Sequence, residues 1–340
     1  MIYRSKAPLR IGLAGGGTDV SPYSDLYGGA ILNATISLFA RANIEPLPGN
    51  RIILEANDRQ ESQDCEHTEE IPVNGYLDLL KGVINCVQRD YGKIRHGFKL
   101  STFVDAPAGS GLGTSSTLVV AIIGAFAEML KLPMGEYDIA HYSYEIERGY
   151  LNLAGGKQDQ YAATFGGVNF MEFYSDDKVI VNPLRVKQQY LSELENNLVL
   201  YYTATSRESA RIIEQQSKNV TNKQSSSIDA MHQLKQQSQM MKEALLRGKL
   251  NEFGEILDYG YEQKRKMASG ISNPLMEEIY ADAKKAGATG GKISGAGGGG
   301  FMIFYCPGTT KYAVIEALSR FGGEHRSYQF TQQGLETWSM

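Results

Sequence analysis

The sequence has few of the residues that build metal clusters or disulfide frameworks. Its 340 residues include only three cysteines, Cys65, Cys86 and Cys306, and five histidines. The cysteines are odd in number and lack the spacing of metal ligands, so we expect reduced and mostly buried thiols. The histidines form no cluster along the chain. These scarcities argue against a structural zinc site.

Long apolar runs and an excess of positive charge are also missing. No apolar run reaches the ~18 residues that a membrane helix needs, and the first six residues lack the apolar core of a signal peptide. The net charge of −4 gives no general attraction to nucleic acid or anionic membrane, so any basic site must be local. We therefore expect a cytoplasmic protein with no nucleic-acid or membrane partner.

The spacing of apolar residues predicts an α+β fold of two domains, which we place at residues 1–185 and 186–340. Predicted strands cover residues 3–14, 31–44, 51–56, 98–105, 168–174, 178–181, 197–203, 301–305 and 325–330. Predicted helices cover residues 76–91, 117–131, 136–150, 250–267, 274–286 and 311–321. The polar segment 58–72 predicts a surface loop. Segment 217–238 is rich in Gln and Ser but keeps helical spacing, which favours an amphipathic surface helix over a disordered linker.

The main motif is a glycine-rich turn between a predicted strand and a predicted buried helix. Residues 106–116 read A-P-A-G-S-G-L-G-T-S-S. Such a turn brings unpaired backbone N–H groups to one point, where the helix dipole adds roughly half a positive charge. The sequence therefore predicts a polyphosphate site made by Pro107, Gly109, Ser110, Gly111, Leu112, Gly113, Thr114, Ser115 and Ser116.

A simple helix cap is the alternative for this turn, but a cap needs one hydroxyl and none of the glycines. Other phosphate-binding patterns do not match. The chain has no G-x-x-x-x-G-K-[ST] loop, and a G-x-G-x-x-G pattern from Gly109 would need glycine where Thr114 stands. The H-R-D and D-F-G pair of protein kinases is also missing.

A second glycine run covers residues 287–300, with glycine at 295 and at 297–300. Glycine costs backbone entropy wherever it is not needed, so a turn does not account for five of them. A flexible linker would be longer and rich in serine, and would not lie between apolar segments. The run predicts a second backbone wall that closely approaches a ligand.

The first turn, P-x-G-x-G-L-G-[ST]-S, resembles the second motif of the small-molecule kinases grouped with galactokinase, homoserine kinase, mevalonate kinase and phosphomevalonate kinase. Residues 8–19, P-L-R-I-G-L-A-G-G-G-T-D, resemble the first motif of that family, and the glycine run resembles the third. The motifs occur in family order over nearly the whole chain. The resemblance implies the two-domain α+β fold of the family, with ATP bound between the domains.

The resemblance also implies roles for charged residues. The loop at residues 155–160, G-G-K-Q-D-Q, resembles the loop with the catalytic Asp, here Asp159, and Arg10 matches the basic residue beside it. Glu147 and Ser115 match the ligands of Mg²⁺. A surface location is the commoner explanation for each carboxylate alone, but their joint spacing with the glycine motifs favours function. Arg10 beside Asp159 would favour the ionised carboxylate.

Further substrate contacts are expected from Gly16, Gly17, Thr18 and Asp19 in the first motif and from Gly297 and Gly298 in the third. In galactokinase-like members an Asp at the place of Asp19 holds sugar hydroxyls. Those members carry a Glu-His pair where this chain has Gly16 and Gly17, which argues against galactose as the substrate.

A phosphorylated acceptor brings about two negative charges and needs a local cation. Arg207 follows a predicted buried strand at the start of a predicted helix, where backbone N–H groups also favour an anion. Lys157 is the rival cation. A weak surface ion pair with Glu208 is the simpler alternative for Arg207.

Within the family, three segments look most like those of bacterial kinases that phosphorylate the anomeric hydroxyl of D-glycero-α-D-manno-heptose 7-phosphate. They are A-G-G-G-T-D at residues 14–19, G-G-K-Q-D-Q-Y-A-A at residues 155–163 and G-G-K-I-S-G-A-G-G-G-G-F at residues 290–301. We therefore expect ATP, Mg²⁺ and this sugar phosphate as ligands, with the 1,7-bisphosphate as product for nucleotide-activated heptose. A fucose-type or other sugar 1-kinase, a mevalonate-type kinase and a non-catalytic sensor of ATP and sugar are the alternatives. The sequence leaves a homodimer open.

Overall fold

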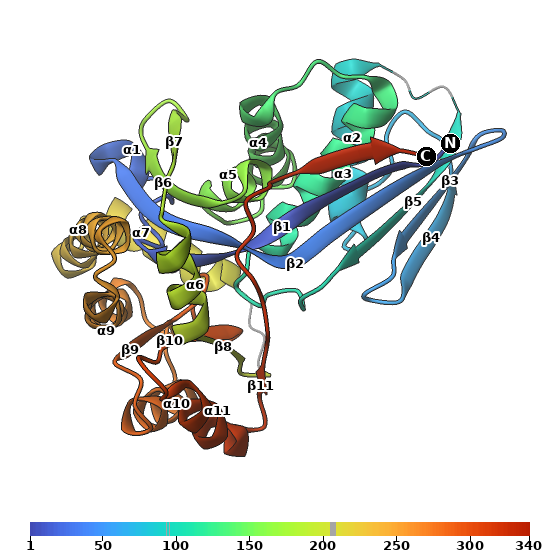
Figure 1. Ribbon diagram of the computed structural model, residues 1–340. Helices are drawn as coiled ribbons and strands as arrows, with labels where there is room; N and C mark the ends of the chain where they lie inside the picture. The colour runs from blue at the N-terminus through green and yellow to red at the C-terminus, as the bar shows by residue number, and fades with distance from the viewer. Residues whose placement is uncertain (93, 95, 205–208) are drawn as a thin grey trace.

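Strand β2 (Gly29–Leu47) is the central strand of the larger of two sheets (Figure 1). The computed structural model describes residues 1–92, 94, 96–204 and 209–340. β1 (Tyr3–Ala14) pairs with β2 along most of its length, and all pairings of β2 are antiparallel. The remaining strands of this sheet are β3 (Arg51–Ala56), β4 (Glu61–Glu66), β5 (Gly97–Val104), β6 (Val168–Phe173), β7 (Val179–Pro183) and β12 (Glu336–Ser339). The main order is β12-β1-β2-β5-β3-β4, and β6 and β7 extend from the N-terminal half of β2.

The smaller sheet is antiparallel, in the order β11-β8-β10-β9. Its strands are β8 (Leu198–Tyr202), β9 (Gly290–Ile293), β10 (Phe301–Tyr305) and β11 (Glu324–His325). β10 is apolar and buried along its whole length, because it lies between β8 and β9 and is covered on its faces. An internal strand of this kind has a continuous apolar run rather than an alternating one.

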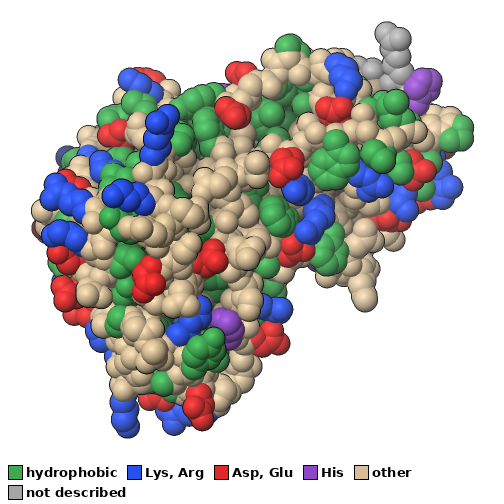
Figure 2. Space-filling view, in the orientation of Figure 1, with side chains coloured by type: hydrophobic (Ala, Val, Ile, Leu, Met, Phe, Trp, Pro, Cys, Tyr) green, Lys and Arg blue, Asp and Glu red, His purple; other side chains and the backbone are tan. Residues whose placement is uncertain are grey.

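Helices α2 (Asp78–Tyr91), α3 (Thr114–Leu130), α4 (Glu136–Tyr144) and α5 (Gln158–Phe165) lie on one side of the larger sheet (Figure 1). On the other side lie α8 (Ser225–Arg247), which contacts β1 and β2, and α9 (Leu250–Met267), which contacts β1 as well as β9 and β10 of the smaller sheet. The remaining helices are α1 (Tyr23–Tyr27), α6 (Gln188–Asn197), α7 (Ser209–Thr221), α10 (Pro274–Lys285) and α11 (Lys311–Leu318). Figure 2 shows acidic and basic side chains interspersed over one face, in keeping with the small net charge.

Helix α3 forms the centre of the hydrophobic core. It is apolar on most of its faces, and side chains such as Val120, Ile123 and Phe126 are fully buried. The Phe126 ring packs edge-on against Phe98 of β5, with 5.6 Å between ring centres. The same cluster extends to residues such as Phe253 of α9, so one apolar core joins the two sheets. The three cysteines are free thiols, as predicted.

The predicted α+β class is confirmed, and most predicted strands and helices are present within a few residues. The division at residue 185 stays a prediction, and β12 lies in the larger sheet although it follows the smaller one in sequence. None of the helices in the described ranges combines the length and apolar character that crossing a membrane requires.

Four predicted segments need correction. The predicted loop 58–72 contains β4, an edge strand whose polar side chains hide its alternation. In segment 325–330 only His325 belongs to a strand, and Phe330 makes one bridge to Ile36. The predicted helix 136–150 changes to a π-helical turn at Glu145–Tyr150. Segment 217–238 is helical but is divided by a turn between α7 and α8, because Lys223 adopts a positive φ of 54°.

The core predicts unequal effects for two phenylalanines of β5. Phe98→Ala should lower the free energy of unfolding by about 3–5 kcal/mol, because it leaves a cavity against Phe126. Phe103→Ala is the control, since this side chain is 45% exposed on the opposite face of the strand. Denaturant unfolding of both variants measures the difference. Equal losses would contradict this description of the core.

Candidate active site

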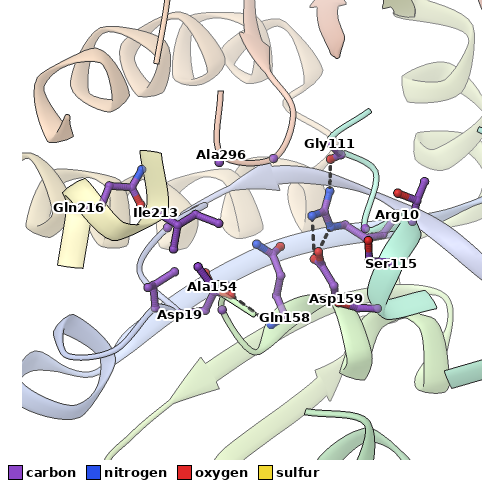
Figure 3. Close-up of a pocket in the computed structure, with 18 of the residues that line it drawn as sticks. Arg10, Asp19, Gly111, Ser115, Ala154, Gln158, Asp159, Ile213, Gln216 and Ala296 are labelled. Carbon is purple, nitrogen blue, oxygen red and sulfur yellow. Dashed lines mark hydrogen bonds and ion pairs between the residues drawn. The ribbon is translucent and has the colours of Figure 1, made fainter. Parts of the chain in front are cut away.

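A polar cavity of about 170 Å³ lies where the larger sheet, its helices and the loops of the smaller sheet meet (Figure 3). Its walls come from segments that are far apart in the sequence. They are Arg10 of β1, the loop that follows β1, the glycine turn before α3, residues 154–156, 158 and 159, α7, Lys264 of α9 and residues 295–296. The cavity therefore combines residues from both sides of the predicted boundary.

Arg10 and Asp159 form the central ion pair of this cavity (Figure 3). Arg10 Nε donates a hydrogen bond to Asp159 Oδ1 at 2.7 Å, and a second guanidinium nitrogen lies 2.7 Å from the same oxygen. The third nitrogen donates to the carbonyl of Gly111 at 2.6 Å. The Arg10 side chain is 4% exposed and that of Asp159 is 22% exposed, so the carboxylate remains accessible from the cavity.

The glycine turn before α3 requires its glycines. Gly109, Gly111 and Gly113 have φ values of 71°, 83° and 79°, in the left-handed region that glycine adopts without strain. A Cβ on Gly111 would lie 2.6 Å from the carbonyl oxygen of Ser294, so the turn packs directly against the second glycine run. Helix α3 begins at Thr114, and the first residues of the helix, Thr114, Ser115 and Ser116, line the cavity. This arrangement is suited to an anion.

Asp19 fixes the start of α5, the helix that carries Asp159. Its Oδ2 accepts hydrogen bonds from the backbone N–H groups of Lys157 at 2.9 Å and Gln158 at 3.1 Å. Its Oδ1 is buried and has no hydrogen-bond partner among the described residues. Burial, reinforced by the negative charge of Asp159, raises the pKa of Asp19. The free oxygen can accept a hydrogen bond from a hydroxyl group of a ligand.

Glu147 lies beside the first turn of α3 and is buried. The side-chain amide of Gln160 donates to its Oε2 at 2.5 Å and to the hydroxyl of Ser116 at 3.1 Å. Burial raises the pKa of Glu147, while Arg148 opposes the shift. Within the described ranges, no group of three or more His, Cys, Asp or Glu side chains is placed so that it could hold a metal ion. The hydroxyl and carboxylate oxygens here still suit Mg²⁺, which binds few protein ligands and completes its shell with phosphate and water.

Six of the predicted phosphate-binding residues line the cavity: Gly109, Gly111, Gly113, Thr114, Ser115 and Ser116. Within the described chain, three others lie outside the cavity wall. Leu112 is fully buried, and its carbonyl accepts a hydrogen bond from the N–H of Arg10. The carbonyl of Ser110 accepts a hydrogen bond from the N–H of Phe301. Pro107 is exposed.

The predicted substrate contacts are only partly brought together. Gly17 and Asp19 line the cavity, whereas the Thr18 hydroxyl binds the carbonyls of Gly15 and Ala30 within the loop. Gly16 lies behind the wall. Gly297 and Gly298 pack against Ile271, and their neighbours Gly295 and Ala296 face the cavity instead.

Of the two residues predicted to bind the acceptor phosphate, the structure describes Lys157 but not Arg207. The Lys157 ammonium lies outside the cavity wall in the described chain, 2.7 Å from Asp177 and 3.5 Å from Asp25. Arg207 falls outside the described residues, so its role stays a prediction.

Several cavity residues were not predicted, notably Gln158, Ile213, Gln216 and Lys264. Lys264 had a detectable signal, because it continues the apolar stripe of α9 that includes Leu257 and Tyr261. A lysine at a buried helix position needs an explanation, since lysine is almost never fully buried without a partner. Gln216 and Ile213 gave no comparable signal in their polar segment.

Comparisons with known proteins identify the family of this chain. The family description "GHMP kinases N terminal domain" matches residues 78–167, and "GHMP kinases C terminal" matches residues 241–324. The chain belongs to the GHMP kinases. D-glycero-alpha-D-manno-heptose 7-phosphate kinase of Campylobacter jejuni is 46% identical over 335 residues, which cover 98% of each protein.

Two further relatives frame the choice of substrate. The crystal structure of a D-glycero-D-manno-heptose 1-phosphate kinase from Bacteroides thetaiotaomicron is 45% identical, has a TM-score of 0.84 and covers 99% of both chains. L-fucokinase/L-fucose-1-P guanylyltransferase of Bacteroides fragilis is 27% identical, and the match covers 87% of this chain but 34% of that protein.

The raised pKa of Asp19 predicts a stabilising substitution. Ionisation of a buried carboxyl costs stability. This cost is absent well below the ordinary pKa, grows as the pH rises from the ordinary pKa to the raised one, and stays constant above it. Asp19→Asn removes the charge and keeps an oxygen for the two N–H groups. We expect its Tm to exceed the wild-type value by about 2 °C or more near pH 8, with the gain shrinking toward about pH 4.

Thermal scans at several pH values measure this effect. Asp229→Asn, at an exposed position of α8, is the matched control and should show no such pH-dependent gain. An Asp19→Asn variant that is less stable than wild type throughout the pH range would show that the carboxylate charge stabilises the loop.

Proposed function

We propose that this chain transfers the γ-phosphoryl group of ATP to the anomeric hydroxyl of D-glycero-α-D-manno-heptose 7-phosphate and forms the 1,7-bisphosphate. The observation that carries this proposal is the 46% identity to a heptose 7-phosphate kinase over 98% of the chain. The cavity supports it, since an anion-binding turn and an accessible carboxylate lie in the same wall. The two heptose kinase relatives have names that differ in the position of the phosphate, so the product must be determined directly.

The nucleotide is assigned to two adjoining cavities. The polar cavity and its glycine turn suit the phosphates. A second cavity of about 230 Å³ shares Thr114 and Ser115 with it and is lined by apolar side chains such as Leu77, Val104 and Leu118. Apolar walls beside a few polar groups are typical of a site for a planar base. The base therefore enters the second cavity and the phosphates extend toward Asp159.

Asp159 is assigned to the acceptor hydroxyl. In the reaction the anomeric oxygen forms a bond to the γ-phosphorus, the bond from that phosphorus to the bridging oxygen breaks, and ADP leaves. The hydroxyl proton passes to Asp159 if this residue is a base, or to solvent if it only orients the hydroxyl. Arg10 holds the carboxylate in place and, through Gly111, fixes it relative to the phosphate turn.

Ser115 and Glu147 are the residues that would hold Mg²⁺. The ion would neutralise negative charge on the phosphates of the bound nucleotide. Gln160 orients Glu147 through its amide, and Arg148 lies 3.8 Å from the other carboxylate oxygen.

The sugar ring is assigned to the end of the cavity opposite the phosphate turn, between Asp19 and α7. The unpartnered Oδ1 of Asp19 would accept a hydrogen bond from a sugar hydroxyl, and the buried side chain of Gln216 lies in the same wall. Arg207, which precedes α7 in the sequence, keeps its predicted role at the acceptor phosphate.

A fucose-type or other sugar 1-kinase is the alternative enzyme. A non-catalytic sensor of ATP and sugar is the alternative class, although Asp159 and Glu147 are both present. An acceptor panel at fixed ATP decides among them. We expect turnover with heptose 7-phosphate, little with fucose or mevalonate, and a product that carries its new phosphate at the anomeric position by NMR. Preference for another acceptor would replace the proposed substrate, and ADP release independent of any added sugar would favour the sensor.

The catalytic assignment predicts a selective loss in Asp159→Asn. Turnover should fall by about 10²- to 10⁴-fold, because the amide cannot accept the proton or carry the charge. Steady-state kinetics measure the loss, and calorimetric titration with ATP should give unchanged affinity. Asp176→Asn, at an exposed turn with positive φ that suits Asn, is the control. Near-normal turnover would show that Asp159 has a structural role only.

A further inference from the structure

Two buried lysines lie next to each other behind Arg10. Lys264 comes from α9 and is 3% exposed, and Lys292 comes from β9 and is 6% exposed. A Cβ added to Gly16 would lie 3.7 Å from Nζ of Lys264 and 3.9 Å from Nζ of Lys292. Both ammonium groups therefore meet the same point of the loop after β1.

These lysines have little negative charge to offset them. Within the described residues neither takes part in an ion pair, and the one nearby arginine, Arg10, is already paired with Asp159. Lys264 donates to the carbonyl of Gly295, and Lys292 donates to the carbonyl of Gly12 at 2.6 Å. An ammonium group has three donors, so each lysine has donors to spare. An unpaired charge is costly to bury, and such sites persist where a ligand supplies the counter-charge.

The charged groups near Lys264 shift its pKa in opposite directions. Burial, together with the positive charge of Arg10, lowers the pKa of Lys264 to about 8, and the nearby carboxylate of Asp19 opposes this shift. Lys292 is affected more strongly, because burial, Lys264 and Arg10 all lower its pKa. An anion that enters the cavity would favour the charged form of Lys264.

Lys264 also lies at the junction of the two glycine segments. Its acceptor, Gly295, is so close to the phosphate turn that a Cβ on Gly295 would lie 2.7 Å from Gly111 Cα. Gly111 in turn accepts a hydrogen bond from Arg10, the partner of Asp159. Lys264 is part of the cavity wall, whereas Lys292 lies behind it.

We propose that Lys264 binds a phosphate oxygen of a substrate in the active site. This inference rests on the proposed kinase function. The phosphate belongs either to the γ-position of the nucleotide or to the acceptor sugar. The junction of the glycine segments favours the γ-phosphoryl group, because that is where the nucleotide phosphates approach Asp159.

The test is the binding of four ligands to Lys264→Met by calorimetric titration without turnover. The ligands are the non-hydrolysable imido analogue of ATP, ADP, heptose 7-phosphate and unphosphorylated heptose. Loss of a charge-assisted hydrogen bond should weaken the affected ligand by about 10- to 100-fold. Weaker binding of the ATP analogue with unchanged ADP assigns the γ-phosphate. Weaker binding of heptose 7-phosphate with unchanged heptose assigns the acceptor phosphate.

Lys266→Met is the matched control, since Lys266 is an exposed residue of the same helix that contacts Gln263. Equal losses for all four ligands, or no loss for any, would overturn the proposal. The wild-type acceptor panel tests the proposed function separately, so a different acceptor leaves the nucleotide titrations interpretable.

A second measurement uses the wild-type protein and so does not depend on how the variant folds. Its affinity for the ligand that contacts Lys264 should fall as the pH rises through about 8, because the free amine loses its proton there while the phosphate is already fully ionised. Lys264→Arg, whose guanidinium stays charged, should lose this pH dependence. A flat wild-type profile for all four ligands would contradict the proposal.

Discussion

The hydrogen bonds of the Arg10 guanidinium are the interaction on which the arrangement of the site depends. This group joins β1 to Asp159, 149 positions later, and to the carbonyl of Gly111, 101 positions later. The N–H of Arg10 also donates to the carbonyl of Leu112, so both the side chain and the backbone of β1 hold the phosphate turn. Because the pair is largely buried, its hydrogen bonds face little competition from water. The distance between the phosphate turn and Asp159 is therefore fixed by one residue in a rigid strand.

The site gathers buried charges that do not fully compensate one another. Asp19 and Glu147 have raised pKa values because they are buried, and Lys264 has a lowered one for the same reason. Each of these groups is held at a cost in stability that the apolar core around α3 offsets. Functional sites often violate the rules that govern the rest of a fold. Here the violations lie in one cavity, on segments that pack firmly against both sheets.

The sequence indicated the parts of this site that depend on local backbone conformation. The glycines at 109, 111 and 113 were predictable because a positive φ and a close approach leave no alternative residue. The joining of Arg10 to Asp159 came from family resemblance, since no local pattern connects residues so far apart. Lys292 lies within a motif that was recognised, yet its burial could not be foreseen. β4 was missed because both of its faces are polar, and the position of Lys157 was missed because Asp25 and Asp177 approach it only in the folded chain.

The return of the chain to the larger sheet at β12 constrains the order in which the protein can be assembled during synthesis. β12 pairs with β1 at positions such as Tyr3 and Ser339, after the whole of the smaller sheet has been made. Until then, the outer edge of β1 has unpaired N–H and C=O groups that can pair with another chain. Translation therefore leaves a nascent chain with an open sheet edge through most of its elongation.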